Sequence, residues 1–297
     1  VICDGHYMLI DGGNAEDSDL IYAYLERHGA DHLDYMVATH AHEDHIGGLS
    51  GALNYAAVDV AYCPVTEYGT KVFQNIVKYL GEQGKSVTVP DPGEQFSLGS
   101  AQVEILGPVK EYSDTNNTSI VLRIDYGETS FLFTGDMETA AETDLIDSGA
   151  DLRATVLKAG HHGSDTSSSY QFLREVMPQY TVISVGEGNS YGHPSEEVLS
   201  RFRDAGTEVY RTDMQGHVIA ESDGKTVTFR TDKVSDTATN PTGNSTLQTY
   251  IGNTNSKKFH LRDCTSVKSI QDANRVDFET RLDAVLAGYE PCGRCKP

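Results

Sequence analysis

Strand-like and helix-like runs of apolar residues alternate through the first 232 residues. Short apolar runs bounded by turn residues predict strands, and longer runs with a period near 3.6 predict helices. Strands are expected at residues 1–3, 6–10, 35–39, 86–89, 103–106, 119–125, 130–134, 155–158, 181–184, 208–212, 216–220 and 226–230. Helices are expected at residues 20–28, 68–83, 170–176 and 196–205. Strands and helices mixed in this way predict an α/β fold of two sheets covered by helices.

The composition changes after residue 232. Residues 233–246 are rich in Ser, Thr, Asn, Gly and Pro, which predicts a linker. Residues 247–297 contain eight Lys or Arg and six Asp or Glu, whereas the whole chain has a net charge of −21. We therefore expect a large domain at 1–232 and a separate, slightly basic module at 247–297.

The charge and hydropathy of the chain exclude some classes of function. With 23 Lys and Arg against 44 Asp and Glu, the chain offers no broad cationic face to a phosphate backbone. A local phosphate site built on metal ions remains compatible, because a divalent cation reverses the local charge. No run of 18 apolar residues is present, so no transmembrane span is expected.

Three histidines and an aspartate lie within six positions directly after the strand expected at 35–39. They are His40, His42, Asp44 and His45. His40 and His42 lie two positions apart at a strand end, so their side chains point to the same side and can bind one ion. A turn then directs Asp44 and His45 toward a second ion beside it. Imidazole with carboxylate favours zinc or a similar transition metal, and two adjacent ions can share a hydroxide. The alternative, an incidental polar loop, is disfavoured by the density of histidines.

Other expected strands end in residues that bind metals or protons. Asp136 follows the strand at 130–134, and His161 and His162 follow the strand at 155–158. His193 comes after the strand at 181–184 and a loop rich in glycine and asparagine. Each residue alone is a weak signal. Together they are stronger, because three separate strands are each followed by a residue of a type that binds metal ions.

These motifs resemble a known family. HAHEDH, GDM and HHGS, in this order, resemble the metallo-β-lactamase fold. DTNNTS at 114–119, KAGHHGS at 158–164 and YGHPS at 191–195 further resemble the C-terminal domain of ComEC-type DNA-uptake proteins and their soluble relatives. The resemblance covers residues 1–232 and implies an αβ/βα sandwich with a two-metal site, holding zinc or manganese, at one edge of its sheets.

The resemblance also implies a role for each ligand. His40 and His42 would hold the first ion, and Asp44, His45 and His161 the second. Asp136 would bridge the two ions. His161 is preferred over His162 because it comes first after the strand.

Two departures from the family pattern stand out. Many relatives supply a third histidine for the first ion where this chain has Asn116 and Asn117. Because an amide is a poorer ligand than imidazole, we expect a first site that binds its metal more weakly, prefers Mn²⁺, or binds its metal only together with substrate. The alternative is that Asn116 and Asn117 form a plain turn. An earlier strand with a DVGQGD-like loop is also missing before Asp11, so we expect a chain cut within its first sheet, from an exported bacterial protein whose signal segment is absent.

The implied chemistry is hydrolysis by a metal-activated hydroxide. Asp44 would orient the nucleophile, and His193 would bind a phosphoryl oxygen or protonate the leaving group. Ser164 would donate a hydrogen bond to the substrate, or else cap the following helix. The leading hypothesis is a phosphodiesterase or nuclease acting on DNA. The alternatives are a hydrolase of a small ester, lactone or β-lactam, and a non-catalytic polymer-binding protein. The sequence does not indicate an oligomeric state.

A second cluster lies in the C-terminal module. The spacing of His260, Cys264, Cys292 and Cys295 is typical of a structural zinc site, with a disulfide from Cys264 as the alternative. The segment resembles the zinc module of the Ada DNA-repair protein, but His260 stands where Ada has its methyl-accepting cysteine, so methyl transfer is not expected. The candidate DNA contacts, or else an ordinary charged surface, are Lys257, Lys258, Arg262, Lys268 and Arg294.

Overall fold

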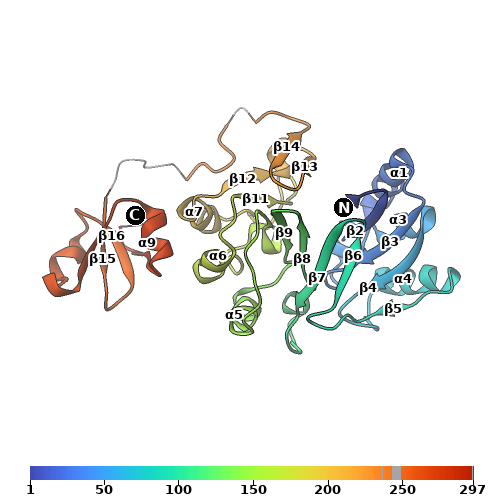
Figure 1. The fold of residues 1–297 in the computed structure, drawn as a ribbon, viewed down its shortest axis with the longest axis horizontal. Helices are drawn as coiled ribbons and strands as arrows, with labels where there is room; N and C mark the ends of the chain where they lie inside the picture. The colour runs from blue at the N-terminus through green and yellow to red at the C-terminus, as the bar shows by residue number, and fades with distance from the viewer. Residues whose placement is uncertain (236, 243–248, 296) are drawn as a thin grey trace.

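The computed structural model describes residues 1–235, 237–242, 249–295 and 297. The linker expected at 233–246 therefore lies partly outside the described residues. Within the described chain, two large sheets stack face to face, and a small sheet forms the C-terminal module (Figure 1). None of the helices in the described ranges is both long and apolar enough to cross a bilayer.

The first sheet has the strand order β1-β2-β3-β4-β5, and its last four strands run parallel. Its strands are β1 (Ile2–Cys3), β2 (His6–Ile10), β3 (His32–Val37), β4 (Ala57–Tyr62) and β5 (Val87–Thr88). The helices that follow these strands are α1 (Ser18–His28), α2 (Glu43–Ile46), α3 (Leu49–Tyr55) and α4 (Lys71–Glu82), with a 3₁₀ turn η1 (Ala15–Asp17).

The second sheet has the strand order β12-β11-β10-β9-β8-β7-β6, and β9 to β12 run parallel. Its strands are β6 (Gln95–Leu98), β7 (Ala101–Gly107), β8 (Val121–Tyr126), β9 (Thr129–Phe133), β10 (Val156–Lys158), β11 (Tyr180–Ile183) and β12 (Glu208–Arg211). Its helices are α5 (Thr139–Asp147), α6 (Tyr170–Val176), α7 (Glu196–Asp204) and α8 (Thr212–Gln215), with 3₁₀ turns η2 (Asn116–Thr118) and η3 (Gly160–Gly163). A separate hairpin of β13 (Val218–Ser222) and β14 (Val227–Thr231) follows.

Three apolar clusters hold these layers together. The cluster between the sheets takes every second residue of β7 and β8, for example Val103, Ile105, Leu122 and Ile124. This period of two places alternate side chains on one face of a strand. A second cluster packs α1, α3 and α4 on the first sheet, and a third packs α5, α6 and α7 on the second. The order helices, sheet, sheet, helices confirms the expected αβ/βα sandwich.

Some elements were not predicted from the sequence. The structure adds β4, β6 and α5, and the edges of other elements differ by a few residues. In α5 the side chain of Glu142 is buried, so the helix lacks an uninterrupted apolar stripe. A buried carboxyl group of this kind breaks the pattern on which helix prediction relies.

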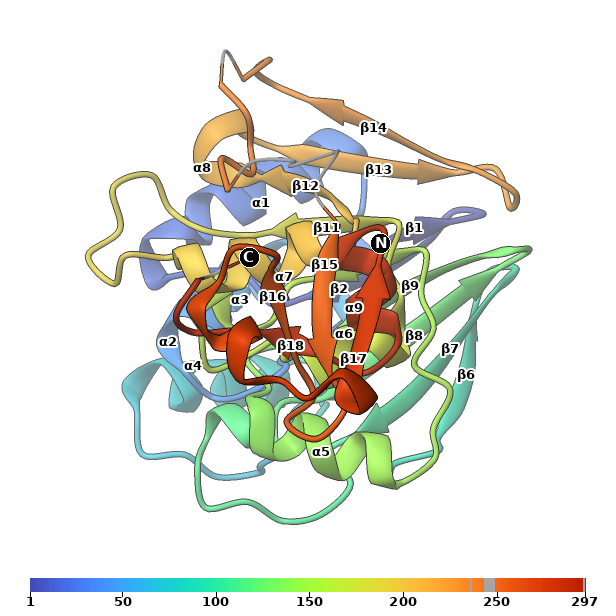
Figure 2. The ribbon, with the colours of Figure 1, turned by 90° about the vertical axis from the view of Figure 1, so that its left-hand side faces the viewer.

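The C-terminal module is a four-stranded sheet with one helix. Its elements are β15 (Tyr250–Asn253), β16 (Lys258–Leu261), η4 (Thr265–Ser269), η5 (Asp272–Asn274), β17 (Arg275–Phe278), α9 (Arg281–Leu286) and β18 (Glu290–Pro291). Helix α9 contacts α6 and α7 of the large domain, in front of which the module lies in Figure 2. Arg281 of α9 approaches the buried Asp204 of α7, with Nη1 3.5 Å from Oδ1, and Tyr170 of α6 donates a 2.7 Å hydrogen bond to the same carboxylate.

Two helical glycines provide a matched test of the packing. A Cβ atom on Gly51 of α3 would lie 1.9 Å from the carbonyl oxygen of Ser18, whereas a Cβ atom on Gly81 of α4 would meet open space. We expect Gly51→Ala to lower the free energy of unfolding by about 2 kcal/mol or more, because α1 must move away. Gly81→Ala should raise it by roughly 0.5–1 kcal/mol through the lower entropy of the unfolded chain. Urea unfolding measures both, and equal effects would contradict this description of the α1–α3 contact.

Candidate metal centre

The predicted ligands of the first cluster lie at the seam between the two sheets. Because β2 and β3 run parallel, the residues after their carboxyl ends meet, and these are Asp11 and the segment from His40 onward. In the second sheet, Asp136 and His161 follow the parallel strands β9 and β10 in the same way. A hydrogen bond of 2.7 Å from the Ile120 N–H to the Thr39 carbonyl joins the two edges.

The orientation of two histidine rings is fixed on the side away from the centre. His45 Nδ1 lies 2.7 Å from Asp11 Oδ2, and His162 Nδ1 lies 2.8 Å from the Ser184 carbonyl oxygen. Both partners only accept hydrogen bonds, so each Nδ1 carries a hydrogen, and each Nε2 becomes available to a metal ion once it has lost its own proton. The two Nε2 atoms lie 3.0 Å apart. This is the arrangement in which histidines bind a metal ion.

Two carboxylates complete this group of ligand atoms. Atoms of Asp44, His45, Asp136 and His162 all lie within 4.8 Å of one another. His45 Nε2 is 3.0 Å from Asp136 Oδ1, and His162 Nε2 is 3.3 Å from Asp44 Oδ2. Two imidazoles and two carboxylates fit a zinc or manganese ion.

His162 occupies the place in this group that the sequence analysis gave to His161. Both residues adopt left-handed backbone conformations, with φ values of 48° and 52°. Two consecutive left-handed residues turn the chain sharply after β10, which brings the second histidine toward Asp44. Both histidines approach Asp136 Oδ2, with His161 Nε2 at 3.7 Å and His162 Nε2 at 3.6 Å, but only His162 also lies beside Asp44.

His40 and His42 form a neighbouring pair of ligands. His40 Nε2 lies 3.1 Å from His42 Nδ1 and 3.9 Å from Asp136 Oδ2. Asp136 therefore lies between this pair and the group around His45. Its position is the one that a bridging ligand requires.

The charge states of Asp136, Asp44 and His40 at neutral pH suit a metal ion, whereas His45 would first have to lose a proton: burial alone would lower its pKa, but Asp11 and Asp136 raise it to about 10. Burial alone would raise the pKa of Asp136, but the surrounding histidines hold it well below its usual range. A hydrogen bond from His162 lowers the pKa of Asp44 to about 2. Burial lowers the pKa of His40 to about 4. Ionised carboxylates and a neutral imidazole are the forms that bind metals.

The asparagines at 116 and 117 bond to Glu138. Asn116 Nδ2 lies 3.3 Å from Glu138 Oε1, and Asn117 Oδ1 accepts a 3.1 Å hydrogen bond from the Glu138 N–H. The same Glu138 Oε1 lies 3.3 Å from His161 Nδ1. The two amides thus support the carboxylate that orients His161, and the remaining oxygen of Asn116 is buried without a partner.

Ser164 and His193 differ in how they relate to the centre. Ser164 is only 4% exposed and its Oγ lies 3.0 Å from Thr166 Oγ1. The cap of α6 is Ser169, whose side chain accepts a hydrogen bond from the Phe172 N–H. His193 lies beside the centre, with its ring centroid 5.7 Å from that of His161. Burial, and then the nearby His161, lower the pKa of His193.

Asp11 and Glu138 were not predicted as site residues. Asp11 accepts hydrogen bonds from the N–H and hydroxyl of Thr39 as well as from His45. In the sequence, Asp11 is marked only by its position directly after the strand expected at 6–10. For Glu138, the signal is a second carboxylate two positions after Asp136.

The loop behind His161 and His162 is anchored from both sides. The buried carboxylate of Glu142 accepts hydrogen bonds from the N–H groups of Ser168 and Ser169 at the start of α6. From α7, Arg201 donates to two backbone carbonyls of the same loop, each at 2.9 Å. A fixed loop holds its ligands in place before a metal binds.

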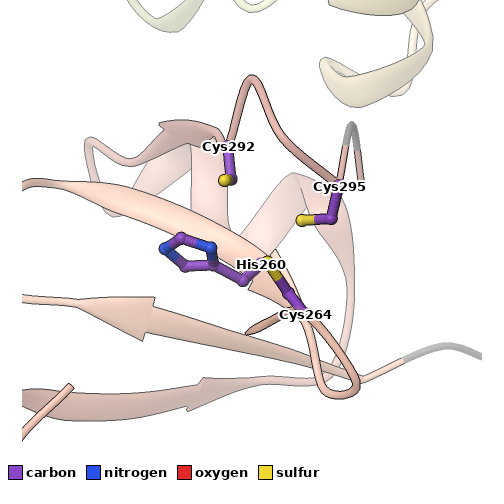
Figure 3. A group of neighbouring side chains, drawn as sticks. All are labelled: His260, Cys264, Cys292 and Cys295. Atoms are coloured by element: carbon purple, nitrogen blue, oxygen red, sulfur yellow. The ribbon is translucent and has the colours of Figure 1, made fainter. Parts of the chain in front are cut away.

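The C-terminal module contains the second candidate site. His260 on β16 and Cys264, Cys292 and Cys295 place their ligand atoms within 4.8 Å of one another, and Figure 3 shows the side chains converging. All five cysteines, which lie within the described residues, are free thiols, so the disulfide alternative is not formed. The buried Nδ1 of His260 has no hydrogen-bond partner. One imidazole and three thiolates are a typical structural zinc set.

Several of the candidate DNA contacts on this module are already engaged. Lys258 pairs with Glu290 at 2.6 Å, and Arg262 pairs with Asp277 at 2.6 Å. Lys257 lies over the ring of Tyr289, with Nζ 4.7 Å from its centroid. Such contacts reduce the positive charge available to a phosphate backbone.

The hydrogen bond from His45 to Asp11 gives a test of the metal centre. Asp11→Asn replaces the carboxylate with an amide and should weaken metal binding by about 10- to 100-fold, because the ring loses its orienting charge. Titration of metal-free protein with Mn²⁺ or Zn²⁺ measures the change. Asp34→Asn is the matched control, since Asp34 makes the same 2.7 Å contact to the exposed His6. Equal affinities of wild type and Asp11→Asn would contradict the orienting role.

The zinc site of the module has its own test. Cys292→Ser should reduce bound zinc by one equivalent per chain and make residues 250–295 sensitive to protease, because a small module depends on its metal for stability. Metal analysis and limited proteolysis measure both effects. Cys3→Ser is the control, since Cys3 lies near Asp4 and Ser100 at the surface. Unchanged zinc content in Cys292→Ser would rule out this ligand set.

Comparison with known proteins agrees with this geometry. The family model of the metallo-β-lactamase superfamily matches residues 1–187. ComE operon protein 3 of Bacillus subtilis (strain 168) is 29% identical over 200 residues, which are 67% of this chain and 26% of the relative. Competence protein ComA of Neisseria gonorrhoeae is 33% identical over 213 residues, 71% of this chain and 28% of the relative.

The chain thus spans about a quarter of the length of these curated relatives. Among solved structures, Tm1679, a metal-dependent hydrolase of the β-lactamase superfamily, aligns with a TM-score of 0.45 and 14% identity over 77% of this chain and 89% of that one. With the family model matching more than half of the residues, the chain belongs to the metallo-β-lactamase superfamily.

Proposed function

We propose that this protein is a metal-dependent phosphodiesterase that cleaves DNA. The observation that carries the proposal is the position of Asp136 between two sets of metal ligands. A two-ion centre stabilises both the attacking and the leaving oxygen of a phosphodiester displacement. One curated relative is named a competence protein, and the motifs resemble those of DNA-uptake proteins, which together support DNA as the substrate.

We assign the ligands by their distances. Asp44, His45, Asp136 and His162 would hold one ion. His40 and His42 would hold the other, with Asp136 shared. For this second set we propose His161 as the third imidazole, because its Nε2 lies as close to Asp136 Oδ2 as that of His40. This assignment would supply the imidazole that Asn116 and Asn117 lack.

The remaining residues have distinct roles in the proposed reaction. Divalent ions bound here would supply Lewis acidity and lower the pKa of a water molecule. The Asp44 side chain is half exposed, so its free oxygen reaches the open side of the centre and can orient the nucleophile. His193 lies next to His161 and is the candidate to donate a proton to the leaving oxygen.

The negative charge of the chain limits how it can bind DNA. Residues 1–246 have a net charge of −23, which repels a phosphate backbone. Binding must therefore depend on the ions and on uncharged contacts. This accounts for a phosphodiesterase without a broad cationic surface.

Cleavage of DNA by metal-loaded protein tests the proposal. Metal-free protein is refilled with Mn²⁺ or Zn²⁺ and incubated with single- and double-stranded DNA. We expect metal-dependent cleavage that Asp44→Ala reduces by more than about 100-fold, a larger loss than removal of a residue that only supports a ligand causes. Glu43→Ala is the matched control, because Glu43 is the exposed neighbouring carboxylate on α2.

Two other outcomes would redirect the assignment. Full metal occupancy with no cleavage of DNA but hydrolysis of a small ester, lactone or β-lactam would establish the small-molecule alternative. Full occupancy with no hydrolysis of any of these compounds would favour a non-catalytic binding protein.

A further inference from the structure

Among the described residues, Tyr191 is the most exposed tyrosine or phenylalanine. Tyr191 is 82% exposed, although leaving the apolar surface of an aromatic ring in water is unfavourable. It lies in the loop between β11 and α7, in the same loop as His193. An exposed aromatic ring beside a reactive centre therefore needs an explanation.

The loop that carries Tyr191 has a defined conformation. The side chain of Asn189 bonds to both backbone groups of His193: Nδ2 donates to the carbonyl at 2.7 Å, and Oδ1 accepts from the N–H at 3.0 Å. Asn189 also donates to the Gly186 carbonyl at 3.1 Å. These bonds close the loop around Tyr191, so the backbone that carries the ring has a fixed conformation before any ligand arrives.

A series of rings connects Tyr191 to the centre. The Tyr191 and His193 rings are nearly parallel, with an interplanar angle of 16° and centroids 5.9 Å apart. His193 in turn lies against His161, at 5.7 Å, whose Nε2 is 3.7 Å from Asp136. Only the His193 ring thus separates Tyr191 from the proposed ligand His161, and Tyr191 extends the series toward solvent.

We propose that Tyr191 is a stacking platform for an unpaired nucleobase next to the scissile phosphodiester. This inference rests on the proposed function and specifies its substrate as single-stranded nucleic acid. Base–aromatic stacking is independent of sequence and needs no positive charge, which suits a domain that repels phosphates. A duplex keeps its bases stacked on one another, so it does not offer a face to the ring.

The same ring chemistry would serve DNA and RNA single strands. Both present unpaired bases with an exposed face, and only the 2′-hydroxyl distinguishes them. The test therefore includes matched oligonucleotides of both kinds, along with a blunt duplex. We expect Tyr191 to contribute on both single strands and little on the duplex.

Cleavage kinetics of metal-loaded variants measure the contribution. Tyr191→Ala should raise KM for single-stranded DNA by about 5- to 150-fold, the range for loss of one base–aromatic stack, with kcat little changed. Tyr191→Phe keeps the ring and should retain the wild-type KM. Tyr24→Ala is the matched control, because Tyr24 also lies against a histidine, His28 at 4.5 Å, but on α1, outside the loops of the centre.

Substrates with a single abasic site identify the contact directly. The abasic site is placed at successive positions along the strand. At one distance from the cut it should slow cleavage by the wild type. At that same position it should not slow cleavage by Tyr191→Ala any further. A role of Tyr191 in folding alone would leave the abasic penalty intact in the variant. That result, or an unchanged KM in Tyr191→Ala, would overturn the proposal.

A binding measurement separates this inference from the proposed function. Oligonucleotides containing 2-aminopurine report stacking through loss of fluorescence, whether or not the strand is cut. Quenching by wild type but not by Tyr191→Ala, without cleavage, would support the platform and reject the phosphodiesterase. Cleavage with the same quenching in both proteins would support the phosphodiesterase and reject the platform.

Discussion

Hydrogen bonds on the far side of the histidine rings orient the metal centre. Asp11 holds His45, and the Ser184 carbonyl holds His162, so both Nε2 atoms point at the same small volume. An imidazole without such a partner is free to rotate and to change its tautomer. The partners come from the ends of β2 and β11, so the parallel order of strands in each sheet is what places them. The fold thus determines the orientation of the two histidine rings through these hydrogen bonds.

Much of this centre could be predicted from the sequence because its signals are local. The histidines at 40, 42 and 45 lie within six positions, and Asp136 and His161 directly follow expected strands. Whether His161 or His162 lies beside Asp44 could not be predicted, because it depends on two left-handed residues whose φ values the sequence pattern does not show. Likewise, the support that Asp11 gives to His45 spans 34 positions, and only the folded sheet reveals it.

The fold was predictable to a similar degree and for a related reason. Strands with alternating apolar residues, such as β7 and β8, stand out in the sequence, whereas α5 does not, because its buried Glu142 serves the loop at the start of α6. Residues that support a functional loop from inside the protein break the simple pattern of apolar and polar positions. The elements missed by sequence analysis therefore include one that anchors the site.

Finally, the ligands are divided between the two halves of the sandwich. His40, His42, Asp44 and His45 follow the first sheet, while Asp136, His161 and His162 belong to the second. Neither half alone has the full set, so an ion bound by both halves favours their docked state over any state in which they are apart. Metal bound at this centre would therefore add to the apolar contacts that hold the two halves together, and removal of the metal would weaken their packing as well as empty the site.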